Sequence, residues 1–319
     1  MSAAETIGID LGGTKMAVGV VDSRPEVLYR ATERSLGLTA EQILAELEEE
    51  AQAAREARPG VEAIGLGIPC TIDQERGVAI AAVNLPIANV PIRDLMHERM
   101  GLPVFIDNDA NVAVLAEHLY GAARDASNVV LLTLGTGIGG GVLLDGRVFR
   151  GSTGAGAELG HVVVDENGPP CQGNCPNHGC VETLASGTAI ARDGRAAAED
   201  APDSVLGRAL AAGEPIEGRT VIDAAVGGDE IAREVVEAAG RHLGVALSTL
   251  ANVFEPNLFV IGGGVMASAG EMILVPAREE LRTRALPPQN ETAVVAAELG
   301  PEAGMIGAAA MARLELDER

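Results

Sequence analysis

Aromatic side chains are almost missing from this sequence of 319 residues, which contains four Phe, two Tyr and no Trp. Aromatic residues normally supply much of the volume of a protein core. Hydrophobic residues nevertheless make up 47% of the chain, enough to build a core from aliphatic side chains. Because charged residues account for 22%, close to the average of about 25%, the composition excludes a disordered chain. The length suggests about two domains.

Basic residues are also scarce: there are 23, against 46 acidic residues, and the formal net charge is −23. Nucleic acids and anionic membranes are bound by basic surfaces, so neither is an expected partner. Only one basic residue is a lysine, Lys15, and it lies inside a glycine-rich turn. Two interpretations stay open: a composition that simply prefers arginine, or a lysine kept to bind an anion.

No run of 18 apolar residues is present, so the sequence predicts no membrane-spanning helix. A predicted strand begins within the first six residues, which leaves no space for a signal segment. We therefore expect a cytoplasmic protein. Cysteine is rare as well, but three of the four cysteines fall within ten residues, a clustering that suits a metal site better than disulfides.

Strands and helices are predicted in alternation, which is typical of the α/β class. Residues 6–22 have the pattern of two strands around a Gly-Gly-Thr turn, and a second strand, glycine turn and strand follow near residue 137. This recurrence indicates two related halves. Residues 165–180 lack the pattern of any regular element. Further predicted strands are 63–69, 104–106, 129–134 and 258–261, and the predicted helices are 40–57, 110–120, 185–198, 230–253 and 304–314.

Glycine, in contrast, is abundant, with 40 residues that gather in turns after apolar strands. Three such turns are residues 10–15, 135–141 and 262–264. Glycine lets backbone N–H groups approach a phosphate closely. One glycine turn can exist for steric reasons alone, whereas three favour phosphate binding. None of them matches the P-loop or the dinucleotide-binding pattern.

These motifs resemble the ROK family (repressors, open reading frames, kinases) of the actin-like sugar kinases. DLGGTK at 10–15 is similar to the first phosphate motif of that superfamily. LGTGIGGG at 134–141, followed by GRVFRGSTGAGAELGH at 146–161, is similar to the ROK signature. IDNDAN at 106–111 and GCVETLASG at 179–187 complete the pattern. The resemblance covers essentially the whole chain.

The resemblance implies two ribonuclease-H-like (actin-like ATPase) domains with the active site in the cleft between them. The small N-terminal domain would comprise residues 1–110 and about 302–319, and the large domain residues 111–301, with the cysteine-rich loop at about 161–180. It also implies a homo-oligomer, a dimer or a tetramer, and ATP with Mg²⁺ as phosphoryl donor, with polyphosphate left open. Lys15 is assigned to the phosphates from its charge and position alone. The residues expected at the nucleotide are Asp10, Gly12, Gly13, Thr14, Lys15, Gly135, Thr136, Gly137, Gly262, Gly263 and Gly264.

Asp109 is the expected catalytic residue. Phosphoryl transfer to a hydroxyl needs a carboxylate that accepts or orients the proton, and Asp109 lies where a predicted strand passes into a helix. Apart from the resemblance, a helix cap would be the favoured interpretation of Asp109, as it is for Asp107. The residues that match the family's substrate-binding positions are Asn108, Asp109, Gly137, Glu158, His161 and Glu182.

The implied reaction is the ATP-dependent phosphorylation of a hexose at its 6-hydroxyl, with D-glucose favoured over fructose because ELGH at 158–161 and GCVE at 179–182 are intact. Asn84 begins a segment that resembles one bordering the sugar, but no aromatic residue follows it as in many relatives. A fructokinase and an N-acetylhexosamine kinase therefore remain alternatives. A sugar-sensing repressor of the same family is a remote alternative, because its helix-turn-helix would precede Thr6 and the charge is unfavourable for DNA.

One histidine and three cysteines have the composition of a closed tetrahedral structural Zn²⁺ site. The common family spacing has one residue between the first two cysteines, whereas this chain has three, Gln172 to Asn174, so the loop carries a two-residue insertion. His178 stays open as a rival ligand. The remaining cysteine, Cys70, is expected to be a small buried hydrophobe. The favoured ligands are His161, Cys171, Cys175 and Cys180.

Overall fold

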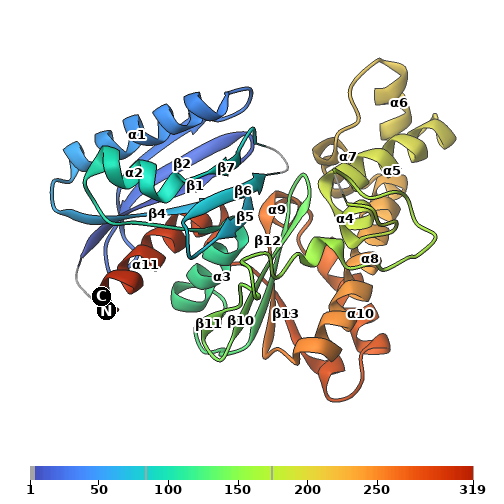
Figure 1. Ribbon diagram of the computed structural model, residues 1–319. Helices are drawn as coiled ribbons and strands as arrows, with labels where there is room; N and C mark the ends of the chain where they lie inside the picture. The colour runs from blue at the N-terminus through green and yellow to red at the C-terminus, as the bar shows by residue number, and fades with distance from the viewer. Residues whose placement is uncertain (1–3, 83–84, 174, 319) are drawn as a thin grey trace. The chain divides into compact units, whose positions relative to one another are not determined.

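The computed structural model describes residues 4–82, 85–173 and 175–318 (Figure 1). Asn84 and Asn174, which figured in the sequence-based expectations, lie outside these ranges. The elements are a mixture of helices and strands, as the α/β class requires. Within the described ranges, every helix is too short or too polar to span a bilayer. The chain divides into two compact units: Met1–Ser127, Gly141–Ala157 and Pro301–Arg319 form the first, and Asn128–Gly140 and Glu158–Gly300 form the second.

The first unit is built on a five-stranded sheet with the order β3-β2-β1-β4-β8. The predicted N-terminal hairpin is confirmed, because β1 and β2 pair antiparallel with Asp10 opposite Ala17. β4 and β8 join on the other side of β1 in parallel, so the carboxyl ends of three strands meet at one edge. The strands are β1 (Glu5–Leu11), β2 (Lys15–Val21), β3 (Val27–Arg34), β4 (Val61–Ile68) and β8 (Val104–Asn108).

Successive side chains of β1 point to opposite faces of the sheet, and these two faces are covered differently. Ile7 and Ile9 point into an aliphatic core beneath α1 (Ala40–Ala57) and α2 (Ile92–Met100). Thr6 and Gly8 point to the opposite face, where α11 (Ala303–Asp317) packs. The hydroxyl of Thr6 donates to the carbonyl of Ala309 on that helix, at 2.8 Å. Figure 1 shows these helices on the two sides of the sheet.

Glycines allow α11 to lie directly on the sheet. A Cβ added at Gly8 would overlap the carbonyl oxygen of Met305, and one at Gly65 would overlap that of Ala308. On the other side of α11, a Cβ at Gly307 would overlap the carbonyl oxygen of Val112 in α3 (Asp109–Tyr120). Close backbone packing of this kind explains part of the glycine content, and it fills space that aromatic side chains would otherwise occupy.

We expect Gly65→Ala to destabilise the protein by at least about 1–3 kcal/mol, the usual cost of overpacking a core. The added methyl group would meet the backbone oxygen of Ala308 rather than a side chain that could rotate away. Urea unfolding followed by circular dichroism would measure the change. Gly60→Ala is the matched control, since a Cβ there would meet no atom of the described chain within 4 Å. Equal stability of the two variants would contradict this packing.

The first unit extends beyond residue 110, because α3 belongs to it as a whole. Val112 and Leu115 of α3 pack with Ala308 and Met311 of α11 in one apolar cluster. The unit also contains the segment that follows the second glycine turn, Gly141–Ala157. A smaller sheet, which the sequence pattern did not indicate, completes it: β5 (Cys70–Asp73), β6 (Val78–Ala82) and β7 (Ala88–Val90).

The second unit contains the parallel strands β9, β12 and β13, with β12 between the other two. Asp229 caps the long helix α8, since its side chain accepts a hydrogen bond from the N–H of Ala232. At Gly240 and Gly244 an added Cβ would meet the backbone of α10, so these two helices also pack closely. The strands are β9 (Val129–Leu134), β12 (Leu258–Gly262) and β13 (Ala293–Ala296), and the helices are α4 (Val181–Ala185), α5 (Gly187–Asp200), α6 (Val205–Ala211), α7 (Gly218–Val226), α8 (Glu230–Phe254), α9 (Gly263–Ala269) and α10 (Glu271–Arg284).

Candidate active site

The first glycine turn, between β1 and β2, is fixed by hydrogen bonds of its own backbone. The N–H of Gly12 donates to the carbonyl of Lys15 at 2.9 Å. The hydroxyl of Ser35 donates to the carbonyl of Gly12 at 2.6 Å, and the N–H of Ser35 donates to the carbonyl of Thr14 at 3.1 Å. Ser35, which no motif indicated, therefore holds the turn that contains the predicted phosphate contacts Gly12, Gly13, Thr14 and Lys15.

Asp10 is the residue before last of β1 and lies just before this turn. Burial first, and then the charge of Asp109, raise the pKa of Asp10 to about 7, while Lys15 opposes the rise. The carboxylate also faces the first turn of α11, because a Cβ added at Gly304 would lie 2.5 Å from an oxygen of Asp10. A carboxyl group with a pKa this far from 3.8 marks a candidate functional position.

Asp109 lies at the carboxyl end of β8, on the first turn of α3. The helix cap is Asn108, whose side-chain oxygen accepts hydrogen bonds from the N–H groups of Ala110 at 2.9 Å and Asn111 at 3.4 Å. The cap is therefore supplied by the neighbour of Asp109, although Asp109 also accepts a bond from the N–H of Ala110 at 3.0 Å. The cap uses the side-chain oxygen of Asn108, and the same amide group also carries two N–H donors.

The charge of Asp109 also reaches Cys70, which begins β5 after the end of β4. Burial, followed by the charge of Asp109, raises the pKa of the Cys70 thiol to about 12. Cys70 is 6% exposed and so stays a neutral, buried thiol, as the sequence predicted. Asp10, Cys70 and Asp109 thus lie near one another at the carboxyl ends of β1, β4 and β8, the edge of a parallel sheet at which ligands usually bind.

The second glycine turn lies at the end of β9. The N–H of Gly135 donates to the carbonyl of Gly137 at 2.9 Å, and the N–H of Gly187 donates to the carbonyl of Gly135 at 2.8 Å. The hydroxyl of Thr188 holds the carbonyl of Thr136 at 2.8 Å. The start of α5 therefore fixes the turn, a support that the sequence alone did not indicate.

The third glycine turn, Gly262–Gly264, joins β12 to α9. Gly263 has a positive φ of 89°, and a Cβ there would overlap the carbonyl oxygen of Leu134. At this position glycine is needed both for the backbone conformation and for the close approach of β9. The second and third turns are consequently neighbours within the second unit.

Glu182 lies directly against the second glycine turn. Its carboxylate accepts a hydrogen bond from the N–H of Ile138 at 2.8 Å, and a Cβ added at Gly137 would overlap the same oxygen. Glu182 is placed in the first turn of α4, where the helix dipole favours a carboxylate. The structure thus brings together two predicted substrate contacts, Gly137 and Glu182.

Glu158 directly precedes the single 3₁₀ turn η1 (Leu159–His161), and His161 is the last residue of that turn. The N–H of His161 donates to the carbonyl of Glu158 at 3.1 Å. A Cβ at Gly160 would overlap the carbonyl oxygen of Ile138, so η1 packs against the start of β10 (Ile138–Leu144). The side chain of Glu158 is exposed and is available to a ligand.

The predicted zinc ligands also come together. Their ligand atoms all lie within 4.8 Å of one another, with Nδ1 of His161 3.4 Å from Sγ of Cys171 and with Sγ of Cys175 4.0 Å from Sγ of Cys180. The rival ligand His178 is exposed and directs Nδ1 towards the carbonyl of Gly168, at 3.3 Å. One imidazole and three sulfurs at these separations fit a tetrahedral zinc site.

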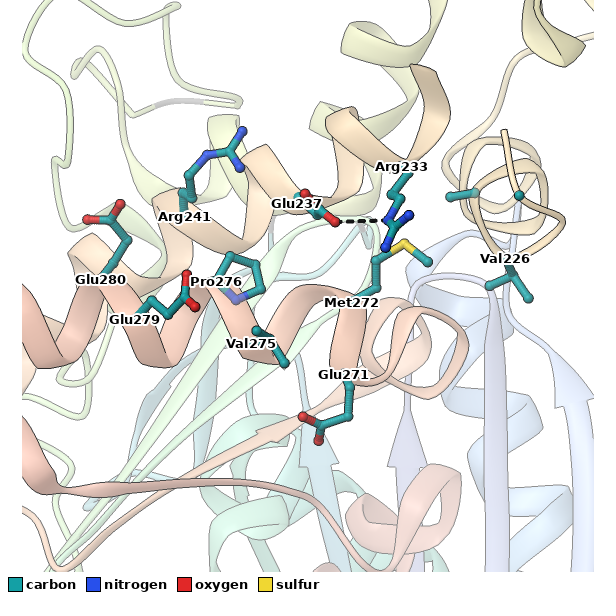
Figure 2. A pocket seen from close by; sticks show the side chains of 12 residues that line it. Val226, Arg233, Glu237, Arg241, Glu271, Met272, Val275, Pro276, Glu279 and Glu280 are labelled. Carbon is teal, nitrogen blue, oxygen red and sulfur yellow. Dashed lines mark hydrogen bonds and ion pairs between the residues drawn. The ribbon is translucent and has the colours of Figure 1, made fainter. Parts of the chain in front are cut away.

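A separate hollow of about 560 Å³ lies between α7, α8 and α10 of the second unit. Figure 2 shows charged side chains on its walls, among which Arg233 and Glu237 form an ion pair at 3.1 Å. The described residues that line it include none of the predicted site residues. It is therefore distinct from the candidate active site.

Comparison with known proteins agrees with the motifs. A glucokinase of Thermotoga maritima is 38% identical over 315 residues, which cover 98% of each chain. The crystal structure of a ROK family glucokinase from Streptomyces griseus in complex with glucose and AMPPNP has a TM-score of 0.86 and 36% identity, and covers 98% of this chain and all of that one.

A second solved structure, the ROK hexokinase of Thermus thermophilus, has a TM-score of 0.80 and 38% identity, with 99% of this chain and 100% of that chain covered. The fold is accordingly the actin-like ATPase fold of the ROK sugar kinases, as the sequence motifs predicted. The sequence profile of the ROK family matches residues 6–315, and the chain therefore belongs to the ROK family.

Proposed function

We propose that this chain transfers the γ-phosphoryl group of ATP to the 6-hydroxyl of a hexose, with D-glucose as its substrate. The observation that carries the proposal is the position of Asp109, a carboxylate at the edge of a parallel sheet, beside Asp10 and next to the helix cap Asn108. The similarity to the glucose-bound and AMPPNP-bound glucokinase supports the choice of sugar and donor.

Asp109 would accept the proton of the 6-hydroxyl as its oxygen attacks the γ-phosphorus. General-base catalysis of this kind contributes about 10²- to 10⁴-fold to a rate. The N–H groups of the Asn108 side chain would donate to a sugar hydroxyl, and Glu158, His161 and Glu182 would supply further partners. Convergent hydrogen bonds of this type select one sugar, because a sugar of another shape leaves buried polar groups unpaired.

The glycine turns would bind the nucleotide. Gly12 to Lys15 in the first unit and Gly135 to Gly137 in the second would lie against its phosphates, and Gly262 to Gly264 would lie near the adenosine. Mg²⁺ bound with ATP would neutralise phosphate charge, and Asp10 is the carboxylate that we expect nearest to it. A homo-oligomer and a cytoplasmic location complete the proposal.

The substrate and the donor can be identified by measuring kcat/KM for a panel of sugars, each with ATP and with polyphosphate. The sugars are glucose, fructose, mannose, N-acetylglucosamine and N-acetylmannosamine. We expect ATP with glucose to give the highest kcat/KM. A higher kcat/KM for fructose or for an N-acetylhexosamine would show that this sugar, and not glucose, is the substrate. Activity with polyphosphate but not with ATP would refute the assignment of the donor.

We further propose that Zn²⁺ binds to His161, Cys171, Cys175 and Cys180. The bound ion would fix the loop that precedes α4 and, with it, the position of Glu182. It would also fix the ring of His161, which approaches Cys171 with Nδ1 and would keep Nε2 for the sugar. In this role, zinc shapes the sugar site and takes no part in the chemistry.

Elemental analysis is expected to find about one zinc ion per chain. Cys171→Ser, Cys175→Ser and Cys180→Ser should each lose it, because each removes one of four ligands. His178→Ala is the matched control and should keep the metal. We expect the zinc-free variants to bind glucose more weakly while ATP binding changes little. Loss of zinc from His178→Ala but not from His161→Ala would show that the ligands are assigned wrongly.

A further inference from the structure

Asp107, which the sequence left as a cap or a structural residue, is the centre of a buried polar cluster in the first unit. Its side chain is 2% exposed. One carboxylate oxygen accepts hydrogen bonds from the side chain of Asn111 at 2.9 Å, from the N–H of Asn108 at 2.8 Å and from the side chain of Gln74 at 3.2 Å. The other oxygen pairs with Nε of Arg150 at 2.7 Å.

Arg150 is the cation that balances this buried charge. A buried carboxylate that loses its partner is strongly destabilised, because no water replaces the lost interaction. Two of the groups that bind Asp107 belong to the peptide that surrounds Asp109: the N–H of Asn108 and the side chain of Asn111. The Asp107 carboxylate therefore holds the chain on both sides of Asp109, at Asn108 and at Asn111.

Arg150 also begins the loop that leads to Glu158. Its carbonyl accepts a hydrogen bond from the N–H of Gly156 at 3.0 Å, which closes the loop. Gly154 has a φ of 82° and packs so closely that a Cβ there would overlap the carbonyl oxygen of Ile72. The loop is thus attached to the first unit at two points, one at Arg150 and one at Gly154, immediately before Glu158 and His161.

We propose that the Arg150–Asp107 ion pair is a positioning device for sugar phosphorylation, which ties the loop that leads to Glu158 and His161 to the strand end that carries Asn108 and Asp109. This inference rests on the proposed function. Neither side chain needs to touch the substrate. The pair fixes the Asp107 carboxylate, which binds Asn108 and Asn111 on either side of Asp109, so its loss should change the sugar reaction more than ATP binding.

Arg93 provides a matched control for Arg150. Both side chains line the same hollow of about 330 Å³, and their exposures are nearly equal, 32% for Arg93 and 31% for Arg150. Arg93, however, pairs with the exposed Asp94 and donates to the backbone carbonyls of Gln74 and Glu75, and it makes no direct contact with the Asp107 carboxylate among the described hydrogen bonds. Arg93→Met thus removes one guanidinium group from the same surface, as Arg150→Met does, but it leaves the ion pair of Asp107 intact.

The test compares Arg150→Met, Asp107→Asn, the double variant and Arg93→Met in steady-state kinetics. A displacement of about 1 Å at a reacting group can cost about 100-fold in rate, and we expect Arg150→Met to lower kcat/KM for the sugar by about this factor. KM for ATP should change less than about threefold. Arg150→Lys should recover part of the loss, because it restores the charge but not the planar donor.

The double variant should be no slower than the slower single variant, since both changes break one interaction. Arg93→Met should keep the kinetics of the wild type. The proposal is overturned if Arg150→Met keeps its sugar kinetics and only unfolds more easily, if sugar and ATP parameters fall equally, or if the two single losses multiply in the double variant. If Arg150→Met does not fold, the same criteria apply to Arg150→Lys and Asp107→Asn.

The proposed function is judged separately, on the wild type alone. Should the wild type prefer another sugar of the panel, the variants are compared on that sugar, and the proposal on the ion pair stands or falls on their ratios to the wild type. Should the wild type phosphorylate no sugar, glucose binding measured by calorimetry takes the place of kcat/KM, and unchanged binding by Arg150→Met overturns the role of the pair.

Discussion

Asp109→Asn is expected to lower kcat for sugar phosphorylation by about 10²- to 10⁴-fold, the range of a lost general base, while the sugar still binds. The amide keeps the shape of the carboxylate but cannot take up the proton of the 6-hydroxyl. Helix α3 should remain intact, because its cap is the side chain of Asn108. A coupled assay of ADP release would give kcat, and calorimetry would give the affinity for glucose.

Asp94→Asn is the appropriate control for the loss of one negative charge from the same unit, since Asp94 is 68% exposed and pairs with Arg93. It should leave kcat unchanged. Near-wild-type turnover of Asp109→Asn would refute the assignment of the base. Loss of glucose binding together with kcat would instead show that Asp109 mainly holds the sugar.

Much of the framework follows from local sequence patterns. The helix predicted at 40–57 is α1 (Ala40–Ala57), where Thr39 and Gln42 form a capping box, and the strand predicted at 129–134 is β9 (Val129–Leu134). Such elements are fixed by caps and by hydrophobic periodicity, which neighbouring residues determine. The order of the glycine turns was likewise visible, because each turn directly follows an apolar strand.

The hydrogen bonds and ion pairs that hold the candidate site residues in place were not predictable in the same way, because they join residues far apart in the sequence. Arg150 and Asp107 are separated by 43 positions, and Thr188 and Thr136 by 52. Gly304 is recognisable as a close neighbour of Asp10 only once α11 is packed on the sheet. A single sequence shows which residue types are present, but long-range pairing depends on the topology.

Asp10→Asn is expected to stabilise the protein at pH 8 while it impairs catalysis. The pKa of Asp10 is raised from 3.8 to about 7, first by burial and then by Asp109. The folded state therefore binds this proton more tightly than the unfolded chain does. As a result, the free energy of unfolding falls as the pH rises from about 4 to about 7 and Asp10 loses its proton. At about 1.36 kcal/mol per pKa unit, the cost at pH 8 reaches up to about 4 kcal/mol.

Asparagine cannot ionise, so Asp10→Asn should avoid this cost. Its free energy of unfolding should exceed that of the wild type at pH 8, and the difference should shrink towards pH 4. Urea unfolding of both proteins at a series of pH values would measure it, with Asp94→Asn as the control for the loss of an exposed charge. A difference that does not depend on pH would contradict the raised pKa of Asp10.

Activity supplies the second half of this prediction. If Asp10 is retained in order to bind Mg²⁺ with ATP, Asp10→Asn should raise KM for ATP and lower kcat in the same protein that unfolds less easily. A stabilising change that costs activity is typical of a functional site that holds unfavourable charge. Full activity combined with the gain in stability would show that the carboxylate serves neither the nucleotide nor the fold.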